Sequence, residues 1–172
     1  SNNVSSIYSV VNIDYYSKED SKNEDAYLFY NLVTGISYLY LGQFKEVIPY
    51  YTTVYNTYSK QSSYTSEEEK SLSELTATLG LCHAYIQNAN DALYYANLAV
   101  KYAKKSKMEK QIALSQFWLA QVYLKIEKYP EAYKTIQQVK TKVDDNVLYQ
   151  SFPATYASIL NEITRIAFEK KQ

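Results

Sequence analysis

The sequence predicts an all-α protein made of about three antiparallel helical hairpins with flanking helices. Glycine and proline occur only three times each in 172 residues, which favours long helices with few breaks over a many-turned β architecture. Three blocks of the chain also share one spacing of small, aromatic and apolar residues. Signals for helix starts and helix ends fall at the edges of these blocks.

The shared spacing begins at a small residue, which is Gly35, Gly80 or Ala120. A small residue in mid-helix lets a neighbouring helix approach closely, and residues 12, 16 and 19 positions later lie on one face of a second helix. Each block therefore predicts a helix, a tight turn and an antiparallel helix. The residues at +3, +9, +12, +16 and +19 are Tyr38, Phe44, Val47, Tyr51 and Val54; His83, Ala89, Ala92, Ala96 and Ala99; and Tyr123, Tyr129, Ala132, Ile136 and Val139.

Capping signals place the ends of the predicted helices. Ser66 with Glu69 three residues later predicts a capping box, and Pro130 stands where a helix begins. Lysines between Lys101 and Lys107 suit the negative end of a helix dipole. The expected helices span residues 4–16, 24–41, 44–60, 67–87, 90–105, 109–127, 130–143 and 152–170.

The three blocks resemble the tetratricopeptide repeat. The motifs that carry this resemblance are G..Y at Gly35, LG..H at Gly80 and LA..Y at Ala120, each followed by the second-helix stripe. The blocks start 45 and 40 residues apart, whereas the family repeat is about 34 residues long. The resemblance implies a right-handed α-solenoid in residues 24–143, with repeats at 24–60, 67–105 and 109–143. Residues 1–23 would hold a helix left from a preceding repeat and a linker, and 144–172 a capping or next-repeat helix.

The only cysteine, Cys82, stands beside the only histidine, His83. Neighbouring helical residues point about 100° apart, so these two do not form a nucleophile–base pair. The sequence has no second Cys or His for a zinc site, no Gly-rich phosphate loop and no G-x-S-x-G motif. We expect no enzyme, no cofactor and no metal. His83 takes the place of Tyr38 and Tyr123, so we expect it to pack between the two helices of its own hairpin.

Charge is divided unevenly along the chain. Residues 1–86 hold five lysines and ten acidic residues, whereas 87–172 hold twelve lysines, one arginine and eight acidic residues. This asymmetry predicts either head-to-tail association of copies or two solvated faces. A single arginine disfavours nucleic-acid binding, since base readout depends on the arginine fork. No run of 18 apolar residues exists, so we expect no membrane insertion.

The resemblance also implies a binding surface, because in tetratricopeptide stacks the first helices line a concave groove. The second, fifth, ninth, twelfth and thirteenth positions of each repeat would point into it. The residues expected to line this groove are largely apolar and aromatic, which suits an amphipathic helix or an extended apolar peptide as the ligand. Alternatively, a neighbouring copy or another part of the chain fills the groove. The expected groove residues are Phe29, Leu32, Ile36, Leu39, Tyr40, Leu81, Tyr85, Leu114, Phe117, Gln121, Leu124 and Lys125, together with Glu74, Ala77, Ala84, Asn161 and Arg165.

Two functions remain as hypotheses. The first is a non-enzymatic scaffold that binds a protein or peptide, forming the docking or sensory segment of a larger bacterial signalling protein. The sequence is rich in Tyr and Ser and has more Lys than Arg, and in this composition it resembles the extracytoplasmic repeat segments of such proteins. The alternative is the signalling-peptide receptor domain of a cytoplasmic transcription regulator. Such regulators present Asn side chains to the peptide backbone, and Asn161 is the candidate here.

Overall fold

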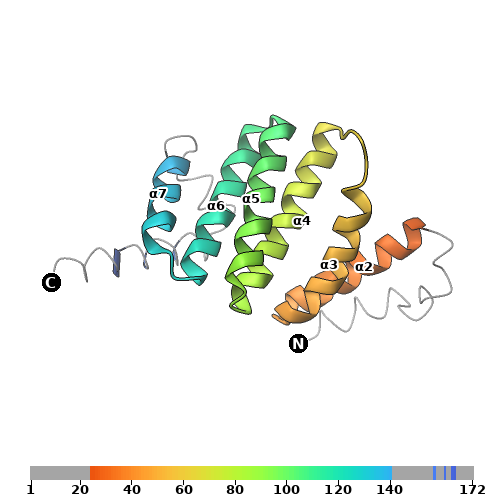
Figure 1. Cartoon of the computed structure of the whole chain (residues 1–172), viewed down its shortest axis with the longest axis horizontal. Coiled ribbons are helices and arrows are strands. Elements are labelled where there is room, and N and C mark those ends of the chain that lie inside the picture. Colours follow the sequence, from red (N-terminus) through yellow and green to blue (C-terminus); the bar gives the residue numbers. More distant parts are fainter. Residues whose placement is uncertain (1–23, 141–156, 158–160, 162–163, 166–172) are drawn as a thin grey trace. The chain divides into compact units, whose positions relative to one another are not determined.

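A computed structural model describes residues 24–140 and four further helical residues, Ala157, Asn161, Thr164 and Arg165. The described part is all-helical and contains no strand (Figure 1). The expected helix at 4–16, and all of the one at 152–170 except those four residues, lie outside it. The helices are α2 (Glu24–Tyr40), α3 (Phe44–Tyr58), α4 (Ser66–Tyr85), α5 (Ala89–Ser106), α6 (Glu109–Lys125) and α7 (Tyr129–Lys140). They confirm the six helices predicted there to within two residues, and the predicted end of the last one, at residue 143, lies outside the described residues.

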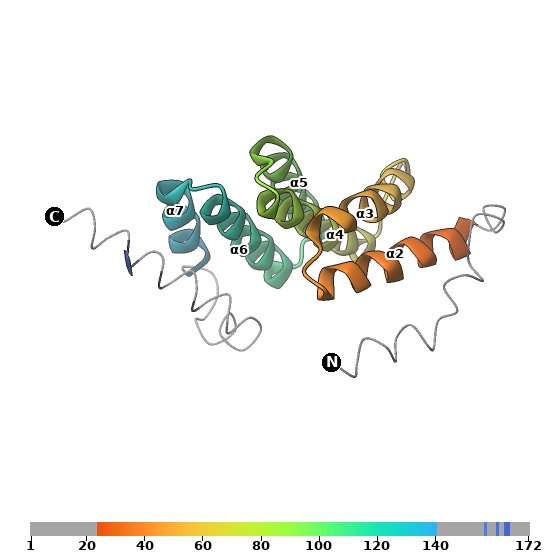
Figure 2. The same ribbon diagram turned by 90° about the horizontal axis from the view of Figure 1, so that it is seen from below.

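Residues 1–61 and 62–172 form two compact units. In the first unit α2 packs against α3. In the second unit α4 packs against α5, α5 against α6, and α6 against α7, and α4 also contacts α6. Figures 1 and 2 show α2 beside α3 in the first unit, and α4 beside α5 and α6 beside α7 in the second. Each block with the shared spacing therefore forms one pair of packed helices.

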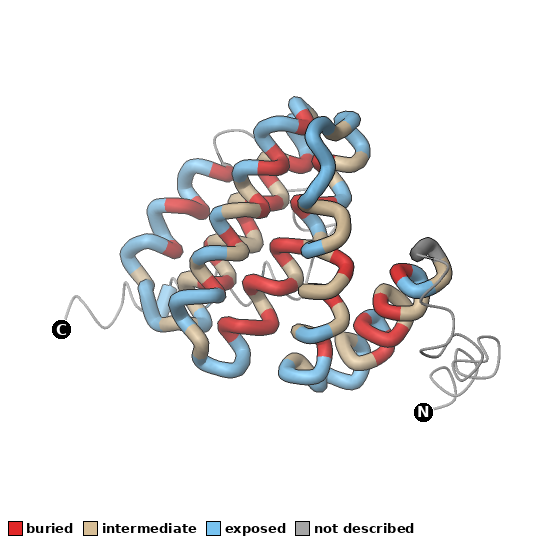
Figure 3. Tube along the Cα trace, turned by 45° about the vertical axis from the view of Figure 1, so that its right-hand side comes forward, coloured by how far each residue is buried: buried red, intermediate tan, exposed pale blue. Residues whose placement is uncertain are grey.

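The predicted stripe on each second helix is buried. Gly35 faces Tyr51, Gly80 faces Ala96, and Ala120 belongs to the same core cluster as Ile136, so in all three pairs the small residue meets the residue 16 positions later. Figure 3 shows buried residues recurring along the helices, on the sides that pack together. The buried stripe consists of Val47, Tyr51 and Val54 in α3, of Ala92, Ala96 and Ala99 in α5, and of Ala132, Ile136 and Val139 in α7.

The turns inside the three pairs are also alike. Two residues after its end, each first helix is followed by a residue of left-handed backbone conformation, Gly42 (φ 69°), Gln87 (φ 63°) or Glu127 (φ 62°), seven positions after the small residue. The next amide N–H donates back to the carbonyl five residues earlier, as in a Schellman motif. These bonds join Gln43 N to Tyr38 O (3.0 Å), Asn88 N to His83 O (2.9 Å) and Lys128 N to Tyr123 O (2.8 Å). The sequence pattern and the backbone geometry thus repeat in the same register.

The capping box of α4 lies one residue earlier than predicted. Thr65, not Ser66, is the N-cap; its hydroxyl accepts from Glu68 N, and the Glu68 carboxylate accepts from Thr65 N at 2.7 Å. Glu69 does not reach back because its side chain is buried, with Oε1 3.7 Å from Lys105 Nζ. The Thr65–Glu68 and Ser66–Glu69 signals overlap in the sequence, and the packing of α4 against α5 favours the first of them.

Candidate functional site

The α2 stripe, which we define as Phe29, Ile36 and Tyr40, is the most exposed part of the predicted groove. These side chains expose 50%, 40% and 77% of their surface and follow one face of the helix at intervals of seven and four residues. Leu32 and Leu39 are half-buried beside it. A row of partly exposed large apolar side chains on one helix face is a candidate contact surface for a partner.

In the second unit, α4 and α6 bring two predicted groove residues into direct contact. Lys125 Nζ of α6 lies 4.5 Å from the ring centroid of Tyr85 of α4, a cation–π contact between the same repeat position of consecutive first helices. Leu81 packs against the core cluster that contains Ala84 and Val122. Leu114 and Leu124 pack against the cluster around Phe117, and Gln121 is half-buried. These first helices therefore offer a surface that is more polar and less exposed than the α2 stripe.

Three predicted groove residues are core residues instead. Phe117 exposes 0% of its surface and packs with Ala113 and Ala120, while Ala77 and Ala84 are also buried. Their assignment to the groove was wrong, because each lies three or four residues from Gly80 or Ala120 on the helix face that meets the second helix. This i, i+3 and i+4 relation to the small residue was the sequence signal that could have placed them correctly. Asn161 and Arg165 are exposed.

An open cleft of about 330 Å³ lies between the N-terminal halves of α4 and α6. Glu74 and Leu114 were predicted to face a partner, and the other lining residues were not. Lys70 and Lys110 each stand ten residues before the small residue of their block, so they occupy the same position in the second and third blocks. The cleft is lined by Lys70, Glu74, Met108, Lys110, Gln111 and Leu114.

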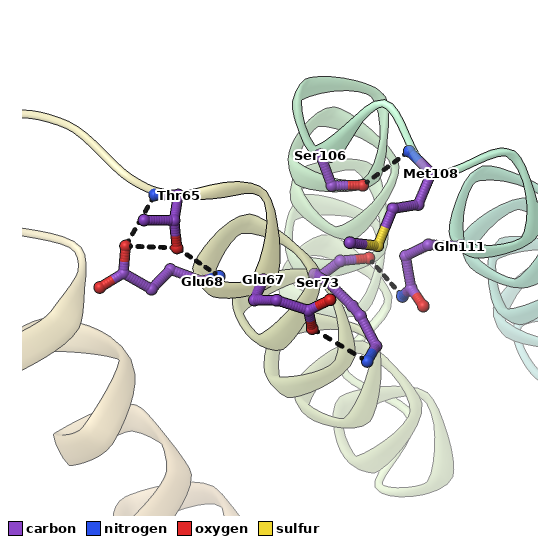
Figure 4. A network of polar contacts seen from close by, with 8 residues as sticks. Thr65, Glu67, Glu68, Ser73, Ser106, Met108 and Gln111 are labelled. Atoms are coloured by element: carbon purple, nitrogen blue, oxygen red, sulfur yellow. Dashed lines mark hydrogen bonds and ion pairs between the residues drawn. The ribbon is translucent and has the colours of Figure 1, made fainter.

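A buried hydrogen-bond chain holds one wall of this cleft in place (Figure 4). Gln111 Nε2 donates to Ser73 Oγ at 3.1 Å, and Ser73 Oγ donates to Ala99 O at 2.9 Å, so the chain joins α6 to α4 and α5. Gln111 is only 3% exposed. At the α5–α6 turn, Met108 N donates to Ser106 Oγ at 3.3 Å. The carboxamide of Gln111 is thus fixed by bonds to buried groups.

Cys82 and His83 contribute packing. Burial raises the pKa of the Cys82 thiol to about 12, so the thiol stays protonated at neutral pH and is a poor nucleophile. His83 stacks on Tyr95 of α5, with ring centroids 5.4 Å apart and 11° between the planes, which confirms its expected place between the helices of its own pair. Its Nδ1 lies 3.4 Å from Asn88 Nδ2 and 3.7 Å from Asp91 Oδ2.

Within the described residues there is no cluster of three or more His, Cys, Asp or Glu side chains able to hold a metal ion. The same residues include no helix that is long and apolar enough to cross a membrane. No protein-family model matches the chain, and no curated protein matches its sequence. A functional interpretation therefore depends on the surfaces of the helices themselves.

Proposed function

We propose that this chain is a non-enzymatic scaffold of the tetratricopeptide-repeat type, which binds a peptide segment of a partner protein along its first helices. The same proposal makes it the docking or sensory segment of a larger signalling protein. Support for the repeat class comes from three helix pairs with the same small-residue contacts and the same left-handed turn. Such pairs stacking into a right-handed solenoid are part of this proposal.

The observation that carries the binding role is the α2 stripe. Phe29, Ile36 and Tyr40 place three large, partly exposed apolar side chains on one helix face, a surface that the apolar side of a peptide or helix can contact. Aromatic anchors of this kind dominate the energy of protein interfaces. The second unit adds Tyr85, which is exposed and held by Lys125.

The proposal is tested by selecting binders from a phage-displayed library of random peptides on the full chain. Peptides rich in Leu, Ile and aromatic residues should be enriched, and Tyr40→Glu or Tyr85→Glu should weaken their binding at least about tenfold, because a carboxylate would replace an apolar anchor. Tyr133→Glu is the matched control, since Tyr133 is exposed on α7, a second helix. Peptides that bind equally well to all three variants would exclude the first-helix surfaces.

A further inference from the structure

Three tyrosine rings meet where α2 packs against α3. Tyr38 of α2 stacks on Tyr50 of α3, with ring centroids 5.6 Å apart and 26° between the planes. Tyr30, eight residues earlier in α2, meets the same Tyr50 ring edge-on, with centroids 6.4 Å apart and 69° between the planes. All three side chains are half-buried. The two helices of the first unit thus share one cluster of phenol side chains.

The hydroxyl groups of this cluster lie close together. Burial raises the pKa of Tyr50 above its ordinary value, and the hydroxyls of Tyr30 and Tyr38 raise it further, through repulsion between ionised phenols and through hydrogen bonding. In a tyrosine ring, the carbon that carries the hydroxyl is bonded to both ortho carbons. Neighbouring hydroxyls on stacked rings therefore bring the ortho carbons of Tyr38 and Tyr50 close to each other.

Ring orientation decides which tyrosine pairs are arranged to form a carbon–carbon bond. A tyrosyl radical holds its unpaired electron in π orbitals, which extend from the faces of the ring and have a large share at the ortho carbons. Stacked rings direct these orbitals toward each other, whereas in an edge-on pair the C–H edge of one ring meets the face of the other. Tyr64 and Tyr102 are edge-on, with 84° between their planes. Tyr38 and Tyr50 have the stacked arrangement that coupling requires.

We propose that the Tyr38–Tyr50 pair is a site of oxidative modification, at which a peroxide-dependent one-electron oxidant joins α2 to α3 through a dityrosine bond. Each phenol loses one electron and its hydroxyl proton, and the two radicals form a bond between an ortho carbon of Tyr38 and an ortho carbon of Tyr50. The hydrogen on each of these carbons is then replaced by one on the ring oxygen, which restores both phenols. Hydrogen peroxide accepts the two electrons and two protons and becomes two molecules of water.

The bond ties the helix that carries the α2 stripe to its neighbour. It closes the segment from residue 38 to residue 50, which contains the turn at Gly42. A cross-link restricts the unfolded chain, as a disulfide does, so α2 and α3 should exchange their amide hydrogens more slowly after oxidation. The inference does not depend on peptide binding, so failure of the proposed function leaves it unaffected.

Oxidation of the full chain with hydrogen peroxide and a haem peroxidase tests the proposal. Trypsin cuts after Lys45, between the two tyrosines, so the bond should join peptide 23–45 to peptide 46–60 in the monomeric fraction, with the loss of two hydrogen atoms. Fragmentation of the joined peptides by mass spectrometry should place the bond at Tyr38 and Tyr50. The same fraction should show the fluorescence of dityrosine.

Phenylalanine substitutions identify the pair, because they keep the ring and remove only the hydroxyl. Tyr38→Phe and Tyr50→Phe should each abolish the joined peptides. Tyr30→Phe is the matched control and should form them as the wild type does, since Tyr30 meets Tyr50 only edge-on. Unfolding in urea before oxidation should reduce the yield, because it separates the rings. A bond at other tyrosines, bonds only between chains, or an equal yield in urea would each overturn the proposal.

Discussion

At the residue scale, a methyl group added at Gly80 would lie 2.9 Å from Ala96 N and 3.1 Å from Ala92 O. Both are backbone atoms of α5, and a helix backbone has little room to move aside. At Gly35 the added carbon would instead meet the ring of Tyr51, a side chain. The close approach of α4 and α5 therefore depends directly on the missing side chain of Gly80.

We predict that Gly80→Ala lowers the free energy of unfolding by about 2 kcal/mol. The overpacking cost of up to about 3 kcal/mol exceeds the gain of about 1 kcal/mol in helix propensity. Urea unfolding followed by circular dichroism measures the change. Ser71→Ala, at an exposed position of the same helix, should stay within about 0.5 kcal/mol of the wild type. A Gly80→Ala protein as stable as Ser71→Ala would show that the contact is looser than described.

The pH dependence of stability is a second prediction at the residue scale. Burial lowers the pKa of His83 below its ordinary 6.5, although the nearby Asp91 carboxylate raises it in part. The unfolded chain therefore takes up the proton before the folded chain does as pH falls through that value. Because proton uptake then favours unfolding, the free energy of unfolding should decrease between about pH 7.5 and pH 5.5.

His83→Tyr is the matched variant for that prediction, since Tyr38 and Tyr123 occupy the same repeat position. His83 is the only histidine in the chain, so its replacement should flatten the dependence in this range. Urea unfolding at a series of pH values measures both slopes. An equal slope in the variant would assign the pH dependence to another group.

At the scale of the element, the turns of the three helix pairs share one backbone but not one residue type. The left-handed position holds Gly42 in the first pair, and Gln87 and Glu127 in the others. A residue with a Cβ atom is strained in this conformation by about 1 kcal/mol or more, whereas glycine is not. The three turns thus provide an internal comparison of strained and unstrained helix ends.

We predict that Gly42→Ala destabilises the protein by about 1 kcal/mol and that Gln87→Gly stabilises it by a similar amount. A Cβ atom at Gly42 would meet nothing within 4 Å, so backbone strain alone causes the loss. Thermal and urea unfolding of both variants measure the two changes. Changes of the same sign would contradict the common turn geometry.

Local signals predicted the helices themselves well but failed where two signals overlapped. Thr65 with Glu68 and Ser66 with Glu69 have the same spacing, and the sequence alone does not separate them. The structure uses Thr65 because Glu69 is turned toward Lys105 of α5. A helix boundary was thus decided by a contact with a residue 36 positions away in the chain.

At the scale of the whole molecule, the core clusters of the second unit are made within a helix pair, as in α6 and α7, or between its two pairs, as where Val122 of α6 joins Ala92 and Ala96 of α5. Phe117 belongs to a cluster with Ala113, Ala120, Ile136 and Val139, all from α6 and α7. In repeat architectures stability is the sum of local units and their neighbour contacts, so a cavity in one unit is felt mainly there.

Phe117→Ala should therefore lower the free energy of unfolding by about 3 to 5 kcal/mol in a local manner. Hydrogen exchange measured by mass spectrometry should increase most in α6 and α7 and least in α2 and α3. Val54→Ala, at a buried position of α3, is the reciprocal control and should act on α2 and α3. Equal increases along the whole chain after either substitution would show that the chain unfolds as one cooperative body.

The sequence by itself determined the all-α class, the number and bounds of the described helices, and the common register of the three pairs, because helix periodicity, capping and small-residue spacing are local. Only the tertiary structure decided which faces of the first helices are accessible. Phe117 proved to be core and Lys110 to line a cleft, since burial depends on which neighbouring helix covers a residue. Whether copies associate through the acidic and basic halves stays a prediction.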